Sequence, residues 1–250
     1  MLRNRGRIEM IVTAGRYFMK NKIAIYLLFC FCSIANAGSQ RTLAVMYFEN
    51  NSLTNKQDMD PLQKGLTDML ITELSKLEQF RVVERNELQR VLKEMELGQS
   101  GLVEESSVQE VGRLLGAQNL LLGSYMFMLD GQLRIDVRIV EVETGLTVKA
   151  EQETGKAKIL HKLVNKLVVK IADNLEVSLT KADAKKLART DNTSFEAAVY
   201  YAKGLEFEDS GDIDKAIQMY KKALSENSAF DKARNKIETL EHSGEKTVSP

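Results

Sequence analysis

The sequence predicts an α/β fold in which helices flank a mixed sheet, followed by a small all-α helical hairpin. Three observations support this class. Short apolar runs alternate with amphipathic helical patterns through residues 41–179, as in domains whose helices cover a sheet. Asp130-Gly131 is followed by a strictly alternating strand, and Asp-Gly is a strong hairpin signal. Residues 194–241 are helical in pattern throughout, which separates them from the α/β part.

The α/β part opens with a buried strand. Residues 42–48 (TLAVMYF) are apolar on both faces, which is typical of a central strand covered on both sides. Asp60-Pro61 then begins a helix, because proline is tolerated in the first turn. Its spacings of three and four give one apolar stripe, made of Leu62, Leu66, Met69, Leu70, Leu74 and Leu77.

A strand and two helices follow. The strand is FRVVE at 80–84, and the helix after it spans 85–97. Ser106 or Ser107 can cap a third, short helix, because serine side chains accept hydrogen bonds from the first free amides of a helix. The inward residues of the second helix are Leu88, Val91, Leu92 and Met95.

The next segment predicts a three-stranded meander. Its first turn is a two-residue turn at Asp130-Gly131, and its third strand spans 146–153. The pattern slips at Ile139-Val140, which indicates a β-bulge. One face of the meander is expected to be buried and the other wet. On the second strand the buried face has Leu133, Ile135, Val137 and Ile139, and the wet face has Arg134, Asp136 and Arg138. An amphipathic helix over 159–175 ends the α/β part.

The remainder divides into a linker, a helical unit and a tail. We expect a linker at 180–193, helices at 194–241 and a tail at 242–250. Within the helical unit, small and aromatic residues recur in the order and spacing of one tetratricopeptide repeat, which this unit resembles. Small residues let two helices approach closely, and the aromatic residues fill the wedge beside them. The packing set is Gly204, Phe207, Ala216, Tyr220 and Ala223. One repeat leaves apolar surface over, to be covered by the α/β domain, another copy or a partner.

The first 37 residues predict a secretory signal peptide. Lys20 and Lys22 precede an apolar run at 23–34, and Ala35-Asn36-Ala37 is a small-x-small cleavage site. Met19 is the better start. A retained anchor is the alternative, but the run is short for a spanning helix. Both cysteines lie within this segment, so the exported chain would have no disulfide or thiolate site.

Charge restricts the partners. The signal segment holds six of the 35 basic residues and one of the 35 acidic residues, which leaves an exported chain of net charge about −5. No long basic run is present, so nucleic acid is not an expected partner. Other envelope proteins and further copies of the chain are the expected partners, with membrane contact at most peripheral.

The α/β part resembles the curli-secretion channel family of CsgG and HfaB over residues 42–178. The matching stretches are LAVMYFEN, FRVVERNELQRVLKE (80–94), GAQNLLLGSY (116–125) and LRIDVRIVEVETG (133–145). A weaker likeness extends to the amino-terminal domain of TolB and to the flagellar outer-membrane protein FlgO. The resemblance implies a periplasmic α/β domain tied to outer-membrane secretion or assembly and prone to ring-like association.

The sequence departs from the channel family at the hairpin. Channel subunits insert two long hairpins into this sheet, and each strand needs roughly 9–11 residues in which apolar side chains alternate outward. Here Asp130-Gly131 turns the chain directly, and 146–158 is charged. We therefore expect a non-enzymatic periplasmic interaction, scaffold or accessory protein that lacks the transmembrane hairpins. A curli-type channel subunit is the first alternative, and an envelope hydrolase is the second.

Candidate chemistry is sparse. His161 and His242 are far apart and accompany no partner motif, so we expect no catalytic residue, cofactor or metal site. Glu84-Arg85 ends a strand, where α/β sites often lie, but a structural ion pair or helix cap is the preferred interpretation. The wet face of Arg134, Asp136 and Arg138 is the predicted interaction face.

Overall fold

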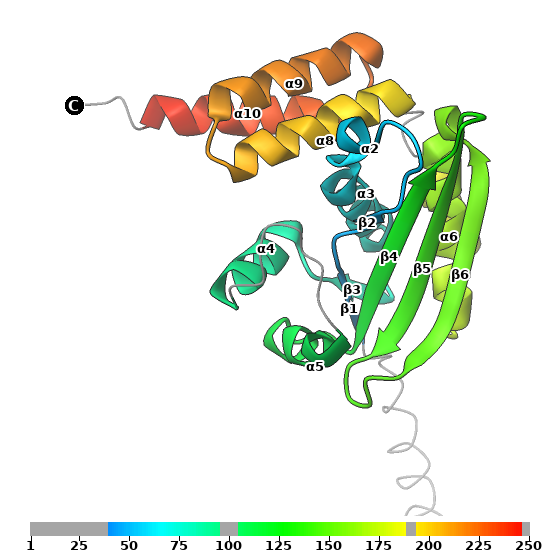
Figure 1. Cartoon of the computed structure of the whole chain (residues 1–250). Helices are drawn as coiled ribbons and strands as arrows, with labels where there is room; N and C mark the ends of the chain where they lie inside the picture. The colour runs from blue at the N-terminus through cyan, green and yellow to red at the C-terminus, as the bar shows by residue number, and fades with distance from the viewer. Residues whose placement is uncertain (1–39, 96–104, 189–193, 247–250) are drawn as a thin grey trace, which may run out of the picture. The chain divides into compact units, whose positions relative to one another are not determined.

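A six-stranded mixed sheet forms the centre of the computed structural model, which describes residues 40–95, 105–188 and 194–246 (Figure 1). The strand order is β3-β1-β4-β5-β6, and β2, which stands outside this order, pairs with β4. The predicted signal peptide lies outside the described residues. The strands are β1 Arg41–Val45, β2 Glu49–Asn50, β3 Phe80–Val82, β4 Asn119–Phe127, β5 Gln132–Glu141 and β6 Thr147–Lys156. The helices are α2 Lys56–Met59, α3 Leu62–Ser75, α4 Arg85–Glu94, α5 Glu105–Leu114, α6 Leu160–Asn174, α7 Lys181–Ala188, α8 Phe195–Asp209, α9 Ile213–Glu226 and α10 Asp231–Lys246, with the 3-10 helix η1 Ala157–Ile159.

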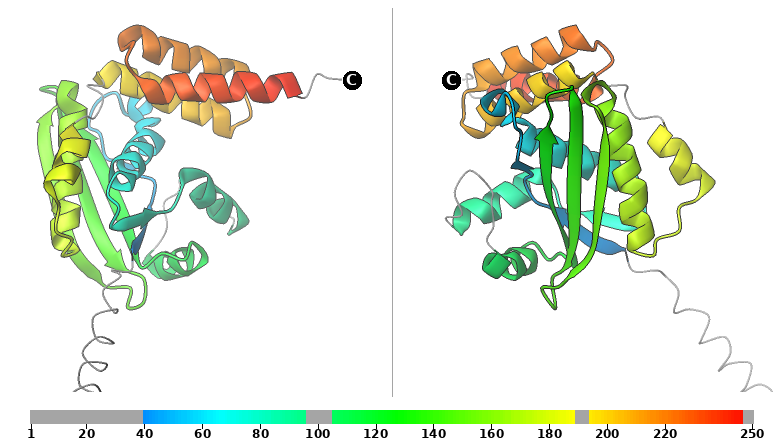
Figure 2. Two further views of the ribbon diagram at one scale, coloured as in Figure 1. Left: turned by 180° about the vertical axis from the view of Figure 1, so that it is seen from behind. Right: turned by 45° about the vertical axis from the view of Figure 1, so that its right-hand side comes forward.

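Strand β1 is the buried central strand that its two apolar faces predict. It pairs in parallel with β3 on one side and with β4 on the other. Leu43 and Val45 enter the core cluster that contains α3 and α6. Ala44, on the opposite face, enters the cluster that contains α4 and α5. Helices therefore cover both faces of β1 (Figure 2), and the predicted fold class is confirmed.

The predicted helical stripes are confirmed as core. All six stripe residues of the segment 62–77 are buried. Leu88, Val91 and Leu92 of α4 are buried as well, whereas Met95, which follows α4, is half-buried against the same cluster. The serine cap is wrong, because α5 begins at Glu105 and so contains both serines. β2 and α2 were not predicted, since each is shorter than the windows in which periodicity can be recognised.

The β4–β5 hairpin is closed by three residues, which corrects the predicted two-residue turn. Phe127 pairs with Leu133, and the Met128 amide donates to the Gln132 carbonyl at 2.9 Å. The Gly131 amide donates to the Met128 carbonyl, and Gly131 has a φ of +74°. A three-residue hairpin loop commonly ends on such a left-handed residue. The prediction of a turn that requires Gly131 is therefore confirmed, and the predicted loop length is wrong.

The alternation of β5 is confirmed. Its four predicted inward residues are 0–1% exposed. A register shift against β6 lies between Ile139 and Val140, where the slip in the pattern predicts the bulge. The third strand, β6, runs to Lys156 and is longer than predicted.

Gly131 provides a test of the loop. We expect Gly131→Val to lower the free energy of unfolding by ~1–2 kcal/mol, because a β-branched L residue is strained at positive φ. Gly131→Asn should cost less, since asparagine tolerates this region. Urea unfolding followed by circular dichroism measures both. Equal losses for the two variants would contradict this conformation.

The segment predicted as a linker, 180–193, contains helix α7. Thr180 and Asp183 form a reciprocal cap: the Thr180 amide donates to Asp183 at 2.9 Å, and the Asp183 amide donates to the Thr180 hydroxyl at 3.1 Å. Leu187 is buried in the larger core cluster. The T-x-x-D signal of such a capping box is in the sequence. The apolar stripe of the helix, however, is too short for the helix to be predicted from it.

The C-terminal helices are α8, α9 and α10, and α10 continues to Lys246 into the predicted tail. The Asp212 side chain accepts from the Lys215 amide and caps α9. Among the described helices, none combines the length and the apolar character needed to cross a membrane.

Candidate functional site

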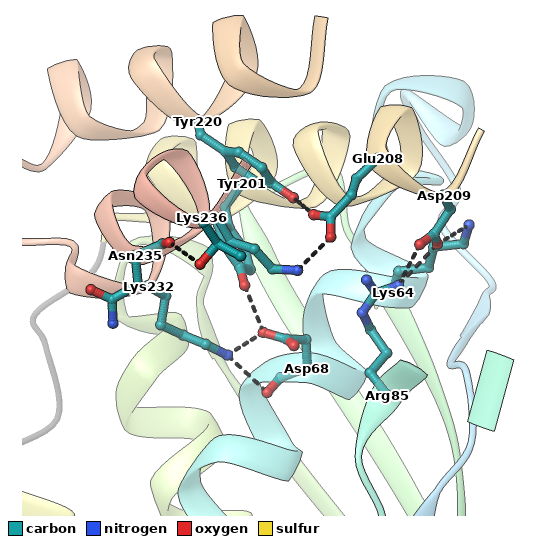
Figure 3. A network of polar contacts seen from close by, with 11 residues as sticks. Lys64, Asp68, Arg85, Tyr201, Glu208, Asp209, Tyr220, Lys232, Asn235 and Lys236 are labelled. Carbon is teal, nitrogen blue, oxygen red and sulfur yellow. Dashed lines mark hydrogen bonds and ion pairs between the residues drawn. The ribbon is translucent and has the colours of Figure 1, made fainter. Parts of the chain in front are cut away.

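Helices α8 and α10 meet α3 and α4 through a set of charged and tyrosine side chains, here called the polar interface, which also includes Tyr220 of α9 (Figure 3). Its members come from five helices in two separate parts of the sequence, α3 and α4 in one and α8, α9 and α10 in the other. They are Lys64, Asp68, Arg85, Tyr201, Glu208, Asp209, Tyr220, Lys232 and Lys236.

One end of the polar interface is a carboxylate held by two cations. The Arg85 Nη1 atom lies 2.8 Å and 2.9 Å from the two oxygens of Asp209. Lys64 Nζ lies 2.7 Å from one of these oxygens. The side chains of Arg85 and Asp209 are 4% and 7% exposed. Burial opposes the charged form of Arg85, but Asp209 outweighs it and raises the pKa of Arg85 above its ordinary value.

This arrangement identifies the role of the Glu84-Arg85 pair. Arg85 is an ion-pair partner of the C-terminal helices, as the preferred interpretation of the sequence has it. Glu84 is the residue before α4 and makes no side-chain cap bond. Arg85 therefore holds two parts of the fold together at the start of α4.

The middle of the polar interface is Asp68 on α3. Lys232 of α10 forms an ion pair with its carboxylate and also donates to its main-chain carbonyl at 3.0 Å. The Tyr201 hydroxyl of α8 donates to the carboxylate at 3.0 Å. Burial alone would raise the pKa of Asp68, but the charge and hydrogen bond of Lys232, with Arg85 and Tyr201, lower it.

At the far end, Glu208 joins the C-terminal helices to one another. The Tyr220 hydroxyl of α9 donates to Glu208 at 2.5 Å, and Lys236 of α10 lies 2.7 Å from the other oxygen. Burial, followed by the hydrogen bond to Glu208, raises the pKa of Tyr220. Tyr220 is therefore a neutral donor at any physiological pH.

Asp68 predicts a pH dependence. Its pKa is lowered from 3.8 in the folded chain, so the unfolded chain binds the proton more tightly. The contribution of Asp68 to stability is thus complete above its unfolded pKa and is lost as the pH falls through the folded pKa. We expect the difference in free energy of unfolding between the parent and Asp68→Asn to be constant above about pH 5 and to shrink below it. Denaturant unfolding across pH measures it, and a difference that stays constant down to about pH 2 would contradict the ion pair.

The structure places the residues of the predicted packing set on α8 and α9. Ala216, Tyr220 and Ala223 are fully buried. A Cβ on Gly204 would lie 2.3 Å from the Tyr220 ring, so the glycine permits the close approach of α8 and α9. Phe207 is half-buried, with Lys215 Nζ 5.5 Å from its ring centre.

The leftover apolar surface of these helices packs on the α/β part, which was one of three predicted covers. Phe195 of α8 stacks on Phe127 of β4, with ring centroids 5.7 Å apart. Ala198 and Ala202 enter the larger core cluster. A Cβ on Gly65 of α3 would lie 2.7 Å from the Ala202 Cβ atom, so α3 and α8 are in close contact.

The predicted interaction face is on β5. The Arg134 guanidinium lies 2.7 Å from Asp136 on the same face, and Arg138 is exposed. An exposed pair of this kind contributes little to stability, because water and salt screen it. The structure therefore places the three residues together on a solvated face and assigns them no partner.

Comparison with known proteins identifies the likeness of the α/β part. Residues 29–126 match the family of the curli production assembly/transport component CsgG. The predicted resemblance to CsgG is confirmed. The match begins within the predicted signal peptide and ends in β4, so it covers residues 42–126 of the predicted range of 42–178. No curated protein matches the chain in sequence.

Several solved structures share the layout over about half of the chain. The LpoB C-terminal domain from Salmonella enterica is 19% identical, and the match covers 49% of this chain and 87% of that one with a TM-score of 0.38. Lipoprotein GNA1162 from Neisseria meningitidis is 13% identical, with 53% and 99% covered and a TM-score of 0.38. The PelC dodecamer from Paraburkholderia phytofirmans is 14% identical, with 55% and 89% covered and a TM-score of 0.36.

The two histidines lie on different helices. His161 is buried on α6, whereas His242 on α10 has Nδ1 2.7 Å from the Glu238 carbonyl. Within the three described ranges, no group of three or more His, Cys, Asp or Glu side chains is placed to hold a metal ion.

Sequence reasoning missed the polar interface. Arg85 and Asp209 are 124 residues apart, and Asp68 and Lys232 are 164 apart, so no local spacing links them. The available signal was compositional: Asp68 and Lys232 stand on helices at positions that amphipathic patterns leave polar. Such positions are usually solvated, and only the docking of the helices makes them partners.

Proposed function

We propose that this chain is a non-enzymatic protein of the bacterial cell envelope. In this proposal it is exported to the periplasm and acts as an interaction, scaffold or accessory factor for outer-membrane secretion or assembly. The observation that carries the proposal is the CsgG match over residues 29–126. The predicted signal peptide supports the same compartment.

The state of the hairpin supports an accessory role over a channel subunit. The inward face of β5 is fully occupied by the larger core cluster, which includes Leu133 and Ile135. The other face carries Arg134 and Asp136. A three-residue loop joins β4 to β5. The hairpin therefore ends within the sheet and has no extension that could form part of a channel.

The C-terminal helices support an interaction role. Their packing set agrees with one tetratricopeptide repeat, which we propose for 194–241. Because α8 packs against α3, a partner protein would bind to the exposed faces of α9 and α10. Their exposed faces are rich in charge: Lys221 and Glu241 form a pair with side chains 61% and 51% exposed.

Two measurements test the proposal. Cell fractionation should find the chain in the periplasm or peripherally on the outer membrane, and purification from the envelope should bring other envelope proteins with it. Recovery in the cytoplasm would overturn the envelope role. Heat-modifiable migration of chain extracted from the outer membrane would favour the channel subunit instead.

Association between copies is part of this proposal, since the resemblance to CsgG implies ring-like assembly. Sedimentation at micromolar concentration measures it. A mass of several copies supports the ring, and a monomeric mass would remove this part while leaving the accessory role intact.

A further inference from the structure

The sheet has two edges, and they differ. β6 has ten residues and pairs along its length with β5, whereas β3 at the other edge has three. The residue just before β3 is bound to α7, since the side-chain Nε2 of Gln79 donates to the Asp183 carboxylate at 3.2 Å. Residues 147–150 of β6 are exposed. Of these two edges, β6 therefore offers the longer row of backbone groups to an added strand.

The free side of β6 lies beside α6. The Gln152 carbonyl accepts from Lys170 Nζ at 2.8 Å, so the backbone of residue 152 faces away from β5. Backbone groups of alternate residues in an antiparallel strand face the same side. Residues 150 and 154 therefore present their amides and carbonyls in the same direction.

A row of lysines on α6 accompanies this edge. We call Lys162, Lys166 and Lys170 the lysine stripe; they stand four residues apart, and the last two are 65% and 40% exposed. Lys166 lies 3.7 Å from Glu153, and Lys170 lies 2.9 Å from Glu153 and 3.4 Å from Glu151. These contacts place Lys166 and Lys170 alongside β6, and Lys162 precedes Lys166 by about one helical turn.

The spacing of the stripe matches that of a strand. Helix positions four apart rise by ~6 Å, and alternate side chains of a strand are ~6.6–6.8 Å apart. The acidic residues of β6 already show this match. Glu151 forms an ion pair with Lys170, and Glu153, two residues further along the strand, forms ion pairs with Lys166 and Lys170. A strand added beyond β6 would likewise place alternate side chains near successive lysines.

We propose that β6 and the lysine stripe bind an extended segment of a partner protein that has acidic residues at alternate positions. Backbone pairing would supply the register, and the lysines would select the acidic side chains. The inference rests on the proposed function and names the chemistry of the partner. A second copy fits less well, because pairing two β6 edges would bring two lysine stripes together.

The probe is a fluorescently labelled ten-residue peptide of alternating glutamate and threonine, titrated against the purified chain by anisotropy. An isomer with its glutamates in one block is the matched peptide. We expect the alternating peptide to bind more tightly and its affinity to fall as salt is added. Amide hydrogen exchange should slow along β6 in the complex.

Variants separate the two parts of the site. Lys162→Glu with Lys166→Glu should weaken binding about tenfold or more, and Lys185→Glu on the exposed face of α7 should leave it unchanged. Gln152→Pro removes one outward amide, which a sheet edge tolerates, and should abolish binding. If Gln152→Pro does not fold, the lysine variants still decide.

Four outcomes would overturn the proposal: no binding of the alternating peptide, equal binding of the block isomer, insensitivity to the lysine stripe, or binding of anionic vesicles in place of the peptide. If the chain instead forms a dimer, and Gln152→Pro returns it to a monomer, the edge binds a second copy. If the peptide fails but envelope proteins still co-purify, this inference alone is wrong. If co-purification fails too, the proposed function is overturned with it.

Discussion

Asp209→Asn is expected to lower the free energy of unfolding by ~3–5 kcal/mol, because it leaves a buried guanidinium without its counter-charge. Arg85 is 4% exposed and finds both oxygens of Asp209 within 2.9 Å. Without this carboxylate, Lys64 and Arg85 also face each other as like charges. Denaturant unfolding followed by circular dichroism gives the energy, and hydrogen exchange along α8 shows whether the C-terminal helices undock first.

A double variant and a surface variant serve as controls. Arg85→Met combined with Asp209→Leu removes the charges together and should be more stable than Asp209→Asn alone, since no buried charge remains unpaired from that pair. Asp214→Asn makes the same chemical change at an exposed position of α9 and should cost less than about 1 kcal/mol. Equal losses for Asp209→Asn and Asp214→Asn would contradict the buried ion pair.

Gly204→Ala is expected to lower the free energy of unfolding by ~1–3 kcal/mol, since the added methyl overpacks a filled site. The new Cβ would lie 2.3 Å and 2.5 Å from two atoms of the Tyr220 ring. Tyr220 is fully buried and bonded to Glu208, so its ring has little freedom to move. Thermal or urea unfolding measures the loss.

Making Gly204→Ala both in the parent chain and in a Tyr220→Leu variant distinguishes overpacking from a backbone effect. In Tyr220→Leu the ring is gone, and alanine is the better helix former by about 1 kcal/mol. Gly204→Ala should therefore become neutral or stabilising in that background. The same loss in both backgrounds would show that the Tyr220 ring is not what excludes a side chain at 204.

Most secondary structure could be predicted, and the misses have a common cause. Strand β5 and helix α3 carry long, regular apolar patterns, and every residue predicted to face inward on them is buried. Helix α7 was missed because its buried contacts amount to little beyond Leu187. The hairpin loop was misjudged by one residue, because a glycine at positive φ suits two-residue and three-residue loops alike.

The sequence by itself determined the order of the longer elements, their inward faces, the bulge at Ile139-Val140 and the close approach at Gly204, because each depends on residues near one another in the chain. The tertiary structure alone decided that α8 docks on α3, that Arg85 pairs with Asp209, and that β6 and the lysine stripe share an edge. These depend on which surfaces meet across more than a hundred residues, or on strand order. A periodic pattern shows that a face is apolar or charged, and it holds no information about the distant face that will cover it.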